Sequence, residues 1–188
     1  AYKSLNIILI CVSFAAAVTI LEASYHMNLV LHDDSLVPGF ASMLIVRELA
    51  VVVMALLLSA KIGAGIAAEV GQMKISEQID ALKLLGINPF NYLVLPRFIA
   101  CVIAGILLCL IANAVCLTTA ALVTTYNLDQ SLAFFMVAFR RFVMAKDLFF
   151  SVVKGAFFCG VIPLVSCYYG FNCEPGANGV GRATTKSV

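Results

Sequence analysis

Four charged side chains are candidates for a functional site: three lie inside or beside long apolar segments, where a charge is costly unless it is paired or hydrated, and the fourth lies in the polar ending of the chain. They are Glu69, Asp147, Lys154 and Arg182. Asp147 and Lys154 are seven residues apart, so on a helix they share one face about 10 Å apart along the axis. This spacing fits an ion pair, or two contacts for a substrate headgroup in a water-lined cavity. The alternative is a structural role in which residues of other helices hold each side chain.

Glu69 and Arg182 each allow two interpretations. Glu69 follows a run of small residues at the end of a span, so it belongs to a charge network lining a cavity or extends to the membrane surface. Arg182 stands in a polar segment near the end of the chain. There it meets a lipid phosphate or only anchors a helix at the interface.

Catalytic motifs are absent from the sequence. The two histidines belong to no HExxH motif, and no GxSxG motif or glycine-rich phosphate loop ending in Lys-Ser or Lys-Thr occurs. The seven cysteines form no CxxC pair. We therefore expect no metal and no cofactor, and we expect any ATP hydrolysis to occur on another polypeptide. A net charge of +2 is too small to indicate nucleic-acid binding.

The composition indicates a membrane protein, with 63% hydrophobic residues, 12% charged residues and a mean hydropathy of +1.05. Apolar segments of about 18 residues or more predict membrane-spanning helices. No alternating barrel pattern is present, so the expected fold class is an all-α helix bundle. The predicted spans cover residues 5–30, 40–60, 96–124 and 149–169.

The segments between these spans are polar or mixed. Turns are predicted at residues 32–39 and 126–131, and residues 132–148 are predicted to form an interfacial helix or the frayed start of the fourth span. Loop charges favour a cytoplasmic N-terminus, which leaves Arg140 and Arg141 on the outside, against the usual preference. We expect one membrane domain over residues 1–188. The polar ending "GVGRATTKSV" predicts that the chain is a fragment lacking a further span.

Residues 61–71 are rich in small side chains. Gly63, Ala64 and Ala68 allow a close approach of two helix backbones in lipid. Packing within the subunit is one interpretation, and a subunit interface or cavity wall is the other.

Residues 76–85 have the pattern of a short amphipathic helix. Ser76 is the predicted N-cap, and Gly86 is a natural residue just beyond the C-terminus. One side is apolar and consists of Ile75, Ile79, Leu82 and Leu85. Such a helix between two spans can transmit motion from a soluble partner, although an ordinary loop helix would show the same pattern.

The segment "RELAVVVMALLLSAKIGAGIAAEVGQMKISEQIDALKLLGINPFNYLVLPR" (47–97) resembles the signature region of the MlaE (YrbE) permeases. The resemblance resumes in "KDLFFSVVKGAFF", "YYGFN" and "GVGRATTKSV". Two departures are Ala50-Val51, where the family has Gly-Pro, and Lys61, where it favours arginine. The family also has an interfacial helix before the first span and a fifth span after the last motif.

The resemblance implies the membrane subunit of an Mce-associated ABC transporter that moves phospholipids or related lipids. It implies these partners: an ABC ATPase subunit, an Mce-domain protein, a second permease copy, a phospholipid substrate and a small regulatory subunit on the ATPase. It places the chain in the bacterial inner membrane, with the chloroplast inner envelope as the less favoured location. Residues 76–85 would be the coupling helix that docks in a groove of the ATPase. The coupling residues would be Ser76, Glu77, Gln78, Asp80, Leu82 and Lys83.

The competing interpretation is an ion-coupled secondary transporter or channel subunit, with Glu69, Asp147 and Lys154 as a relay. That class has no need of a docking helix between spans.

Overall fold

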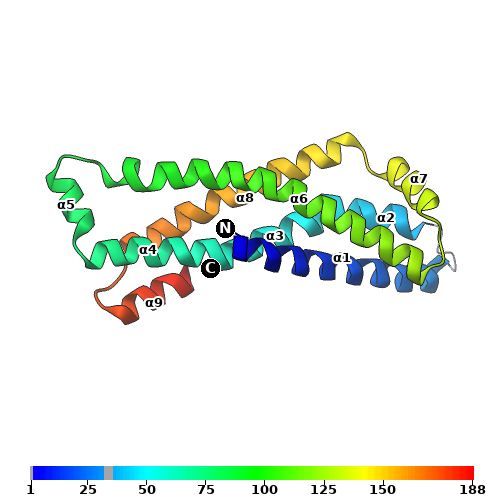
Figure 1. Ribbon diagram of the computed structural model, residues 1–188, viewed down its shortest axis with the longest axis horizontal. Coiled ribbons are helices and arrows are strands. Elements are labelled where there is room, and N and C mark those ends of the chain that lie inside the picture. Colours follow the sequence, from blue (N-terminus) through cyan, green and yellow to red (C-terminus); the bar gives the residue numbers. More distant parts are fainter. Residues whose placement is uncertain (1, 32–35) are drawn as a thin grey trace. The chain divides into compact units, whose positions relative to one another are not determined.

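The computed structural model describes the backbone of residues 2–31 and 36–188, and every regular element in these ranges is a helix. Within these two ranges, four helical segments are long and apolar enough to cross a membrane, which confirms the predicted all-α membrane bundle. Figure 1 shows the elements in chain order. They are α1 (Tyr2–Leu31), α2 (Val37–Leu44), η1 (Ile45–Leu49), α3 (Ala50–Leu58), η2 (Ser59–Gly63), α4 (Ala64–Ile75), α5 (Gln78–Leu84), η3 (Phe90–Val94), α6 (Leu95–Asn127), α7 (Leu132–Phe142), α8 (Ala145–Phe171) and α9 (Ala177–Lys186).

The second span is longer than predicted. The expected end was residue 60, but one apolar helical segment continues from Val37 to Ile75 through two π-helical turns, η1 and η2. The backbone keeps helical dihedral angles through Gly63 and Ala64, so the small residues do not end the helix. The small-residue segment therefore extends the span.

Two predicted boundaries near prolines are also wrong. Part of the turn expected at 32–39 lies outside the described residues, but α2 already begins at Val37, with Pro38 in its first turn. The third span begins at Phe90 instead of Pro96, because the π-helical turn η3 leads directly into α6. Pro38 lies in the first turn of α2 and Pro89 directly precedes η3, positions where the missing N–H group of proline has no partner within the helix.

Residues 132–148 divide between two elements. α7 is a separate helix whose N-terminus is capped by Ser131, with the Ser131 hydroxyl accepting a hydrogen bond from the Phe134 amide at 3.3 Å. Val143 and Met144 are not helical, and α8 then begins at Ala145. The fourth span therefore starts four residues earlier than predicted.

The chain forms two compact units. Unit 1 consists of Ala1–Met54 and Leu107–Gly155. In this unit α1 buries Val12, Ala16 and Ile20, which recur every fourth residue. α7 packs on α2, where the Phe142 ring lies so close to Gly39 that it leaves no room for a Cβ atom at that position.

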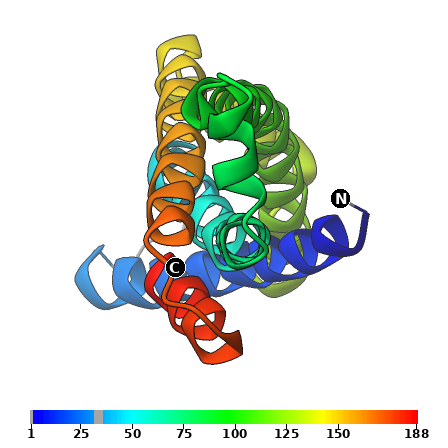
Figure 2. The ribbon, with the colours of Figure 1, turned by 90° about the vertical axis from the view of Figure 1, so that its left-hand side faces the viewer.

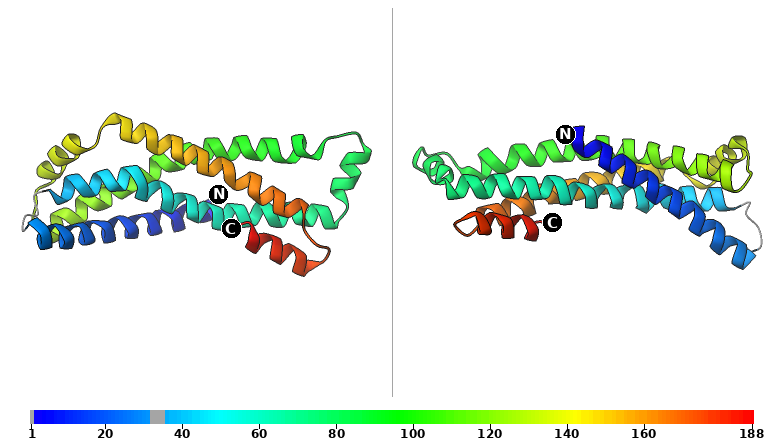
Figure 3. Two further views of the ribbon diagram at one scale, coloured as in Figure 1. Left: turned by 180° about the vertical axis from the view of Figure 1, so that it is seen from behind. Right: turned by 60° about the horizontal axis from the view of Figure 1, so that its bottom comes forward.

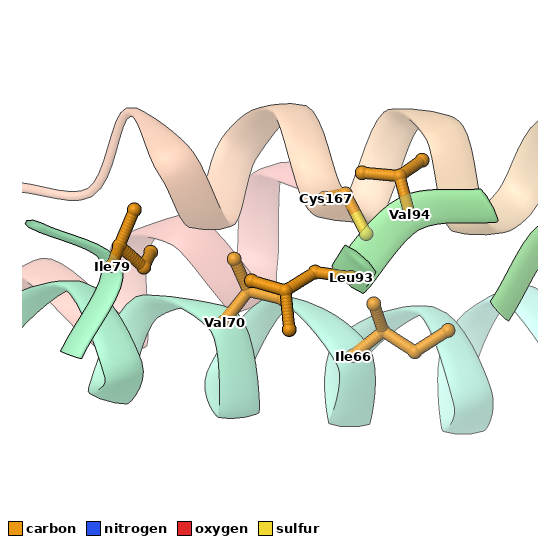
Figure 4. Packing of buried hydrophobic residues seen from close by; sticks show 6 residues of the cluster. All are labelled: Ile66, Val70, Ile79, Leu93, Val94 and Cys167. Carbon is orange, nitrogen blue, oxygen red and sulfur yellow. The ribbon is translucent and has the colours of Figure 1, made fainter. Parts of the chain in front are cut away.

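Unit 2 consists of Ala55–Ile106 and Ala156–Val188. Its core joins α4, α5, η3 and α8 through Ile66, Val70, Ile79, Leu93, Val94 and Cys167 (Figure 4). α9 runs alongside α4 in both views of Figure 3. α4 and α8 approach closely at Gly170, where an added Cβ would lie 2.7 Å from the Val70 Cβ and 3.2 Å from the Ala67 carbonyl oxygen.

Candidate functional site

The predicted coupling segment contains a helix of two turns, α5, which connects the end of α4 to the start of η3 and α6 (Figures 1 and 2). Its N-cap differs from the prediction. Ser76 is the last residue associated with α4, where its hydroxyl donates back to the Gln72 carbonyl at 2.9 Å, and Glu77 precedes α5. Glu77 has φ = 57°, the left-handed conformation that is uncommon for residues with a Cβ atom. The turn between α4 and α5 is thus made by a left-handed residue and not by a serine cap.

The end of α5 matches the prediction. Gly86 has φ = 75°, which glycine adopts without steric penalty. Its amide bonds to the Lys83 carbonyl, and the Ile87 amide bonds to the Leu82 carbonyl, both at 3.0 Å. This pair of bonds is the Schellman motif, which satisfies the last carbonyl groups of a helix. The following Asn88 side chain accepts a hydrogen bond from the Phe90 amide at 3.0 Å and starts the next helical segment.

The two faces of α5 differ in what they contact. Ile79 is buried in the core of unit 2 (Figure 4). Leu82 packs against that core. Leu85, which was predicted on the same side, is instead 73% exposed, and Leu84 is 90% exposed. Leu84 lies four residues after Asp80, so the two share the outward face. The prediction of the apolar side is therefore correct for Ile79 and Leu82 and wrong for Leu85. The outer face carries two exposed leucines, Leu84 and Leu85.

The polar residues of the predicted coupling set are all on the exposed part of this segment. Ser76, Glu77, Gln78, Asp80 and Lys83 are exposed. Lys83 Nζ lies 2.8 Å from Asp80 Oδ1, and this hydrogen bond, with the lysine charge, lowers the pKa of the Asp80 carboxyl group. Asp80 therefore stays ionised in mildly acidic solution.

Glu69 forms an ion pair between the two helices that α5 connects. Its Oε2 lies 3.1 Å from Nη2 of Arg97, which is in α6 and only one-fifth exposed. Nearby, Lys74 Nζ donates to the Phe171 carbonyl at the end of α8. α4 is therefore tied by polar contacts to both other long helices of unit 2. Sequence reasoning named Glu69 but not Arg97.

Of the predicted packing residues Gly63, Ala64 and Ala68, only Gly63 makes a close contact with another helix. Ala64 and Ala68 are only half-buried. The close contacts come from Gly63 and Gly71, where an added Cβ would lie 3.1 Å from Ser166 Oγ and 3.4 Å from Cys173 Sγ, respectively. Together with the buried Ala67, these glycines recur every fourth residue. This stripe serves packing within unit 2.

A second group of polar residues gathers in unit 1, where η1 meets α8. Nε and Nη2 of Arg47 lie 2.8 and 2.7 Å from Oδ1 of Asp147. Lys154 Nζ lies 2.5 Å from Oε1 of Glu48 and 3.3 Å from the Arg47 carbonyl oxygen. Asp147 and Lys154 thus pair with adjacent residues of another helix instead of with each other, which corresponds to the structural alternative.

The π-helical turn η1 carries the two partners. Insertions of this kind in α-helices are frequent at functional sites. Asp147 also accepts a hydrogen bond from the Met144 amide at 2.9 Å, just before α8. It therefore caps the helix as well as binding Arg47, and its side chain is almost fully buried.

These charges line a pocket of about 370 Å³. Three cations and two carboxylates face it, so its net charge is positive, and two apolar side chains complete the wall. The lining residues are Arg47, Glu48, Met144, Lys146, Asp147, Phe150 and Lys154. A positively charged pocket with apolar walls can hold the anionic headgroup of an amphiphile.

Arg182 does not belong to this group. It lies on α9 in unit 2, where its Nη1 is 3.6 Å from Glu174 Oε2, and both side chains are about three-quarters exposed. An exposed pair at this distance contributes little to stability. Of the four charged residues singled out in the sequence, Asp147 and Lys154 line this same pocket, and Glu69 and Arg182 do not.

A family model described as permease MlaE matches residues 1–188. The chain belongs to the MlaE permease family. A probable ABC transporter permease protein of Rickettsia conorii is 34% identical over 187 residues, which are 100% of this chain and 72% of that protein. The chloroplastic protein TRIGALACTOSYLDIACYLGLYCEROL 1 of Arabidopsis thaliana is 33% identical over 150 residues, which are 80% of this chain and 43% of that protein. A probable ABC transporter permease protein of Synechocystis is 32% identical over 150 residues, or 80% of this chain and 57% of that protein.

Membership of the MlaE family makes the chain a multi-span permease subunit of an ABC transporter. An ABC transporter permease implies an ATPase partner. Three residues with evident roles in the geometry were not selected from the sequence: Arg47, Glu48 and Arg97. All three lie in the segment that resembles the MlaE signature, and each is a charge close to an apolar run.

Proposed function

We propose that this MlaE-family permease moves a phospholipid or a related lipid between the bacterial inner membrane and an Mce-domain partner, driven by a separate ATPase subunit. The observation that carries the proposal is the two-sided character of α5. Its inner face is fixed in the core of unit 2 by Ile79 and Leu82, while Leu84, Leu85 and the polar residues face outward.

The outward face of α5 exposes apolar side chains, which contact with a protein partner would remove from water. Exposed leucines beside charged residues are typical of the centre and rim of a protein interface. A groove of the ATPase would accept Leu84 and Leu85, with Glu77, Gln78 and Asp80 at its edge. A small regulatory subunit would act on the ATPase itself.

Movement of α5 would pass into the membrane through rigid contacts. The core residues of unit 2 link α5 to α4, η3 and α8, and the Glu69–Arg97 pair links α4 to α6. Close-packed interiors transmit displacement instead of absorbing it. Closure of two ATPase subunits would therefore shift these helices in each of two permease copies.

The lipid assignment is supported by the pocket in unit 1. Its positive charge suits a phosphate, and Met144 and Phe150 suit the adjoining glycerol and acyl groups. The name of the Arabidopsis relative contains that of a galactolipid, which supports a diacylglycerol-based cargo. In this role Lys154 and Lys146 would contact the headgroup, while Arg47 and Asp147 would hold the wall of the pocket.

The decisive experiment purifies the tagged permease with its co-eluting proteins and lipids from a native membrane and identifies them by mass spectrometry. We expect an ATPase, an Mce-domain protein and phospholipid. The complex is then reconstituted in vesicles with a fluorescent phospholipid, and ATP-dependent transfer is measured with and without an ionophore. Transfer that requires ATP and is insensitive to the ionophore supports the proposal. Transport driven by an ion gradient, with no ATPase in the preparation, would instead establish the ion-coupled alternative.

A further inference from the structure

α7 has an outward face that no described part of the chain covers. Two rows of side chains run along this face, each with a spacing of four residues. One row is Leu132, Met136 and Arg140, and the other is Ala133, Val137 and Arg141; all six are exposed. The exposed fractions of Met136 and Val137 are 59% and 66%. The face is therefore apolar over its first two turns and basic at its last.

The opposite side of α7 is already used for packing. Phe135 and Ala138 are buried, and Phe142 lies against Gly39 of α2. The apolar residues on the outward face are consequently additional to those needed to fix α7 on unit 1. Exposed apolar side chains in such a cluster indicate contact with lipid or another apolar surface.

The charge of this segment has one sign. Between Leu132 and Lys146 the sequence contains Arg140, Arg141 and Lys146 and no acidic residue. Among residues 2–31 and 36–188, no carboxylate forms an ion pair with any of these three cations. Unpaired cations beside an apolar face match a layer of anionic headgroups above acyl chains.

The position of α7 in the chain selects the membrane surface as its partner. α7 joins the third and fourth spans, so both of its ends are held at the boundary of the bilayer. Each span reverses the side of the membrane, and α7 is therefore on the side opposite to α5. With α5 in the cytoplasm, Arg140 and Arg141 lie on the non-cytoplasmic side, where the usual bias of loop charges does not explain them.

We propose that α7 lies in the headgroup layer of the non-cytoplasmic leaflet and that Arg140 and Arg141 bind anionic phospholipids there. Leu132, Met136 and Val137 contact the acyl chains below the headgroups. Met144, which follows the basic end of α7 in the chain, lines the pocket in unit 1. The headgroups bound by Arg140 and Arg141 therefore lie near that pocket. The inference requires only that the chain spans the membrane with α5 on its cytoplasmic side, and it holds whatever the transported substrate is.

The depth of α7 can be measured with a tryptophan reporter, because the chain contains no tryptophan. The variant Met136→Trp is prepared in the permease and reconstituted in phosphatidylcholine nanodiscs that contain phosphatidylglycerol, and the fluorescence of the unsubstituted permease is subtracted. We expect its fluorescence to be quenched by lipids brominated near the carbonyl end of the acyl chains and protected from aqueous iodide. Leu84→Trp on α5 is the control, which iodide should quench in the permease without its ATPase. Iodide quenching of the Met136→Trp variant without quenching by brominated lipid would overturn the proposal.

The lipid selectivity is tested with the double variant Arg140→Gln/Arg141→Gln, which removes both charges and retains polar side chains of similar length. Each cation near an anionic membrane surface strengthens binding by about fivefold, so the preference for phosphatidylglycerol over phosphatidylcholine should fall by more than about tenfold. The association of spin-labelled lipids gives this ratio. Arg182→Gln, which removes an exposed arginine of unit 2, should leave it unchanged. An unchanged preference in the double variant, or shielding of the reporter in Met136→Trp by another protein in the complete complex, would refute anionic lipid as the partner of α7.

Discussion

Arg47 and Asp147, which are one hundred positions apart in the chain, form an ion pair in which two guanidinium nitrogens contact one carboxylate oxygen at 2.8 and 2.7 Å. The residue after Arg47, Glu48, pairs with Lys154. Adjacent residues of η1 thus hold two side chains that are two turns apart on α8. The arrangement ties the start of the fourth span to the first third of the second, and all four side chains line the positively charged pocket.

Asp147→Asn should destabilise the permease, because Arg47 loses its charged partner while the Met144 amide keeps an acceptor. Asp147 is buried but the Arg47 side chain is about half exposed, so removing the carboxylate charge should be moderately destabilising, and we expect the Tm to fall by about 5 °C. A thiol-reactive dye that detects buried cysteines such as Cys109 and Cys116 on heating gives the Tm. Asp80→Asn, in an exposed pair, should change the Tm by less than about 1 °C. Equal losses in the two variants would contradict a structural role specific to Asp147.

Exchanging the charges of Glu48 and Lys154 separates packing from headgroup contact. Glu48→Lys and Lys154→Glu alone each place like charges together, so both should lower the Tm. The double variant restores an ion pair, and the Tm should recover. Its lipid-stimulated ATP turnover should stay low, because the cation has moved away from α8. Recovery of both the Tm and the turnover would show that the pair acts only in packing.

The sequence predicted the class of fold because long apolar runs have few solutions in lipid, but it misplaced features that depend on tertiary contacts. Helix ends at Ile75 and Phe90 were missed because small residues and Pro96 are compatible with a continuing helix when π-helical turns adjust the backbone. The small residues that pack closely were only partly predicted, because Ala64 and Gly63 look alike in sequence, while only packing against α8 distinguishes them. Asp147 and Lys154 were identified by their unfavourable surroundings, but their partners come from another helix and no local spacing encodes them.

Gly170 and Gly65 should respond oppositely to replacement by alanine. At Gly170 an added Cβ would lie 2.7 Å from Val70, so Gly170→Ala should cost about 1–3 kcal/mol of stability. At Gly65 no atom lies within 4 Å of the added Cβ, and alanine in an open helix position stabilises by about 0.5–1 kcal/mol. Reversible unfolding in mixed detergent measures both changes. A stabilising Gly170→Ala would mean that α4 and α8 do not approach as closely as described.

Leu84→Asp should weaken binding of the ATPase without unfolding the permease, since the side chain is 90% exposed and contacts solvent in the free subunit. An apolar anchor at the centre of an interface contributes enough that its loss weakens binding by about 30-fold. Binding of the purified ATPase to permease nanodiscs gives the affinity, and an unchanged Tm shows that the fold is intact. Tyr126→Asp, which alters an exposed side chain at the end of α6, should bind normally. Equal affinity of Leu84→Asp and the unaltered permease would remove Leu84 from the docking surface.

The Glu69–Arg97 pair joins α4 and α6, the two helices that α5 connects, and should determine how far motion of α5 reaches the membrane. Because Arg97 is only one-fifth exposed, Glu69→Arg leaves two cations facing each other in a partly buried place. We expect the ATPase still to bind α5 and hydrolyse ATP. The amount of lipid moved per ATP should fall by about tenfold, a change that lies within the range of interaction energies measured between contacting residues. The reverse pair, Glu69→Arg with Arg97→Glu, should recover part of this ratio. Glu22→Arg on α1 is the matched control for adding a cation at an exposed acidic position. If the double variant transports no better than Glu69→Arg, the pair does not carry the motion, and the core around Ile79 and Val70 must transmit it alone.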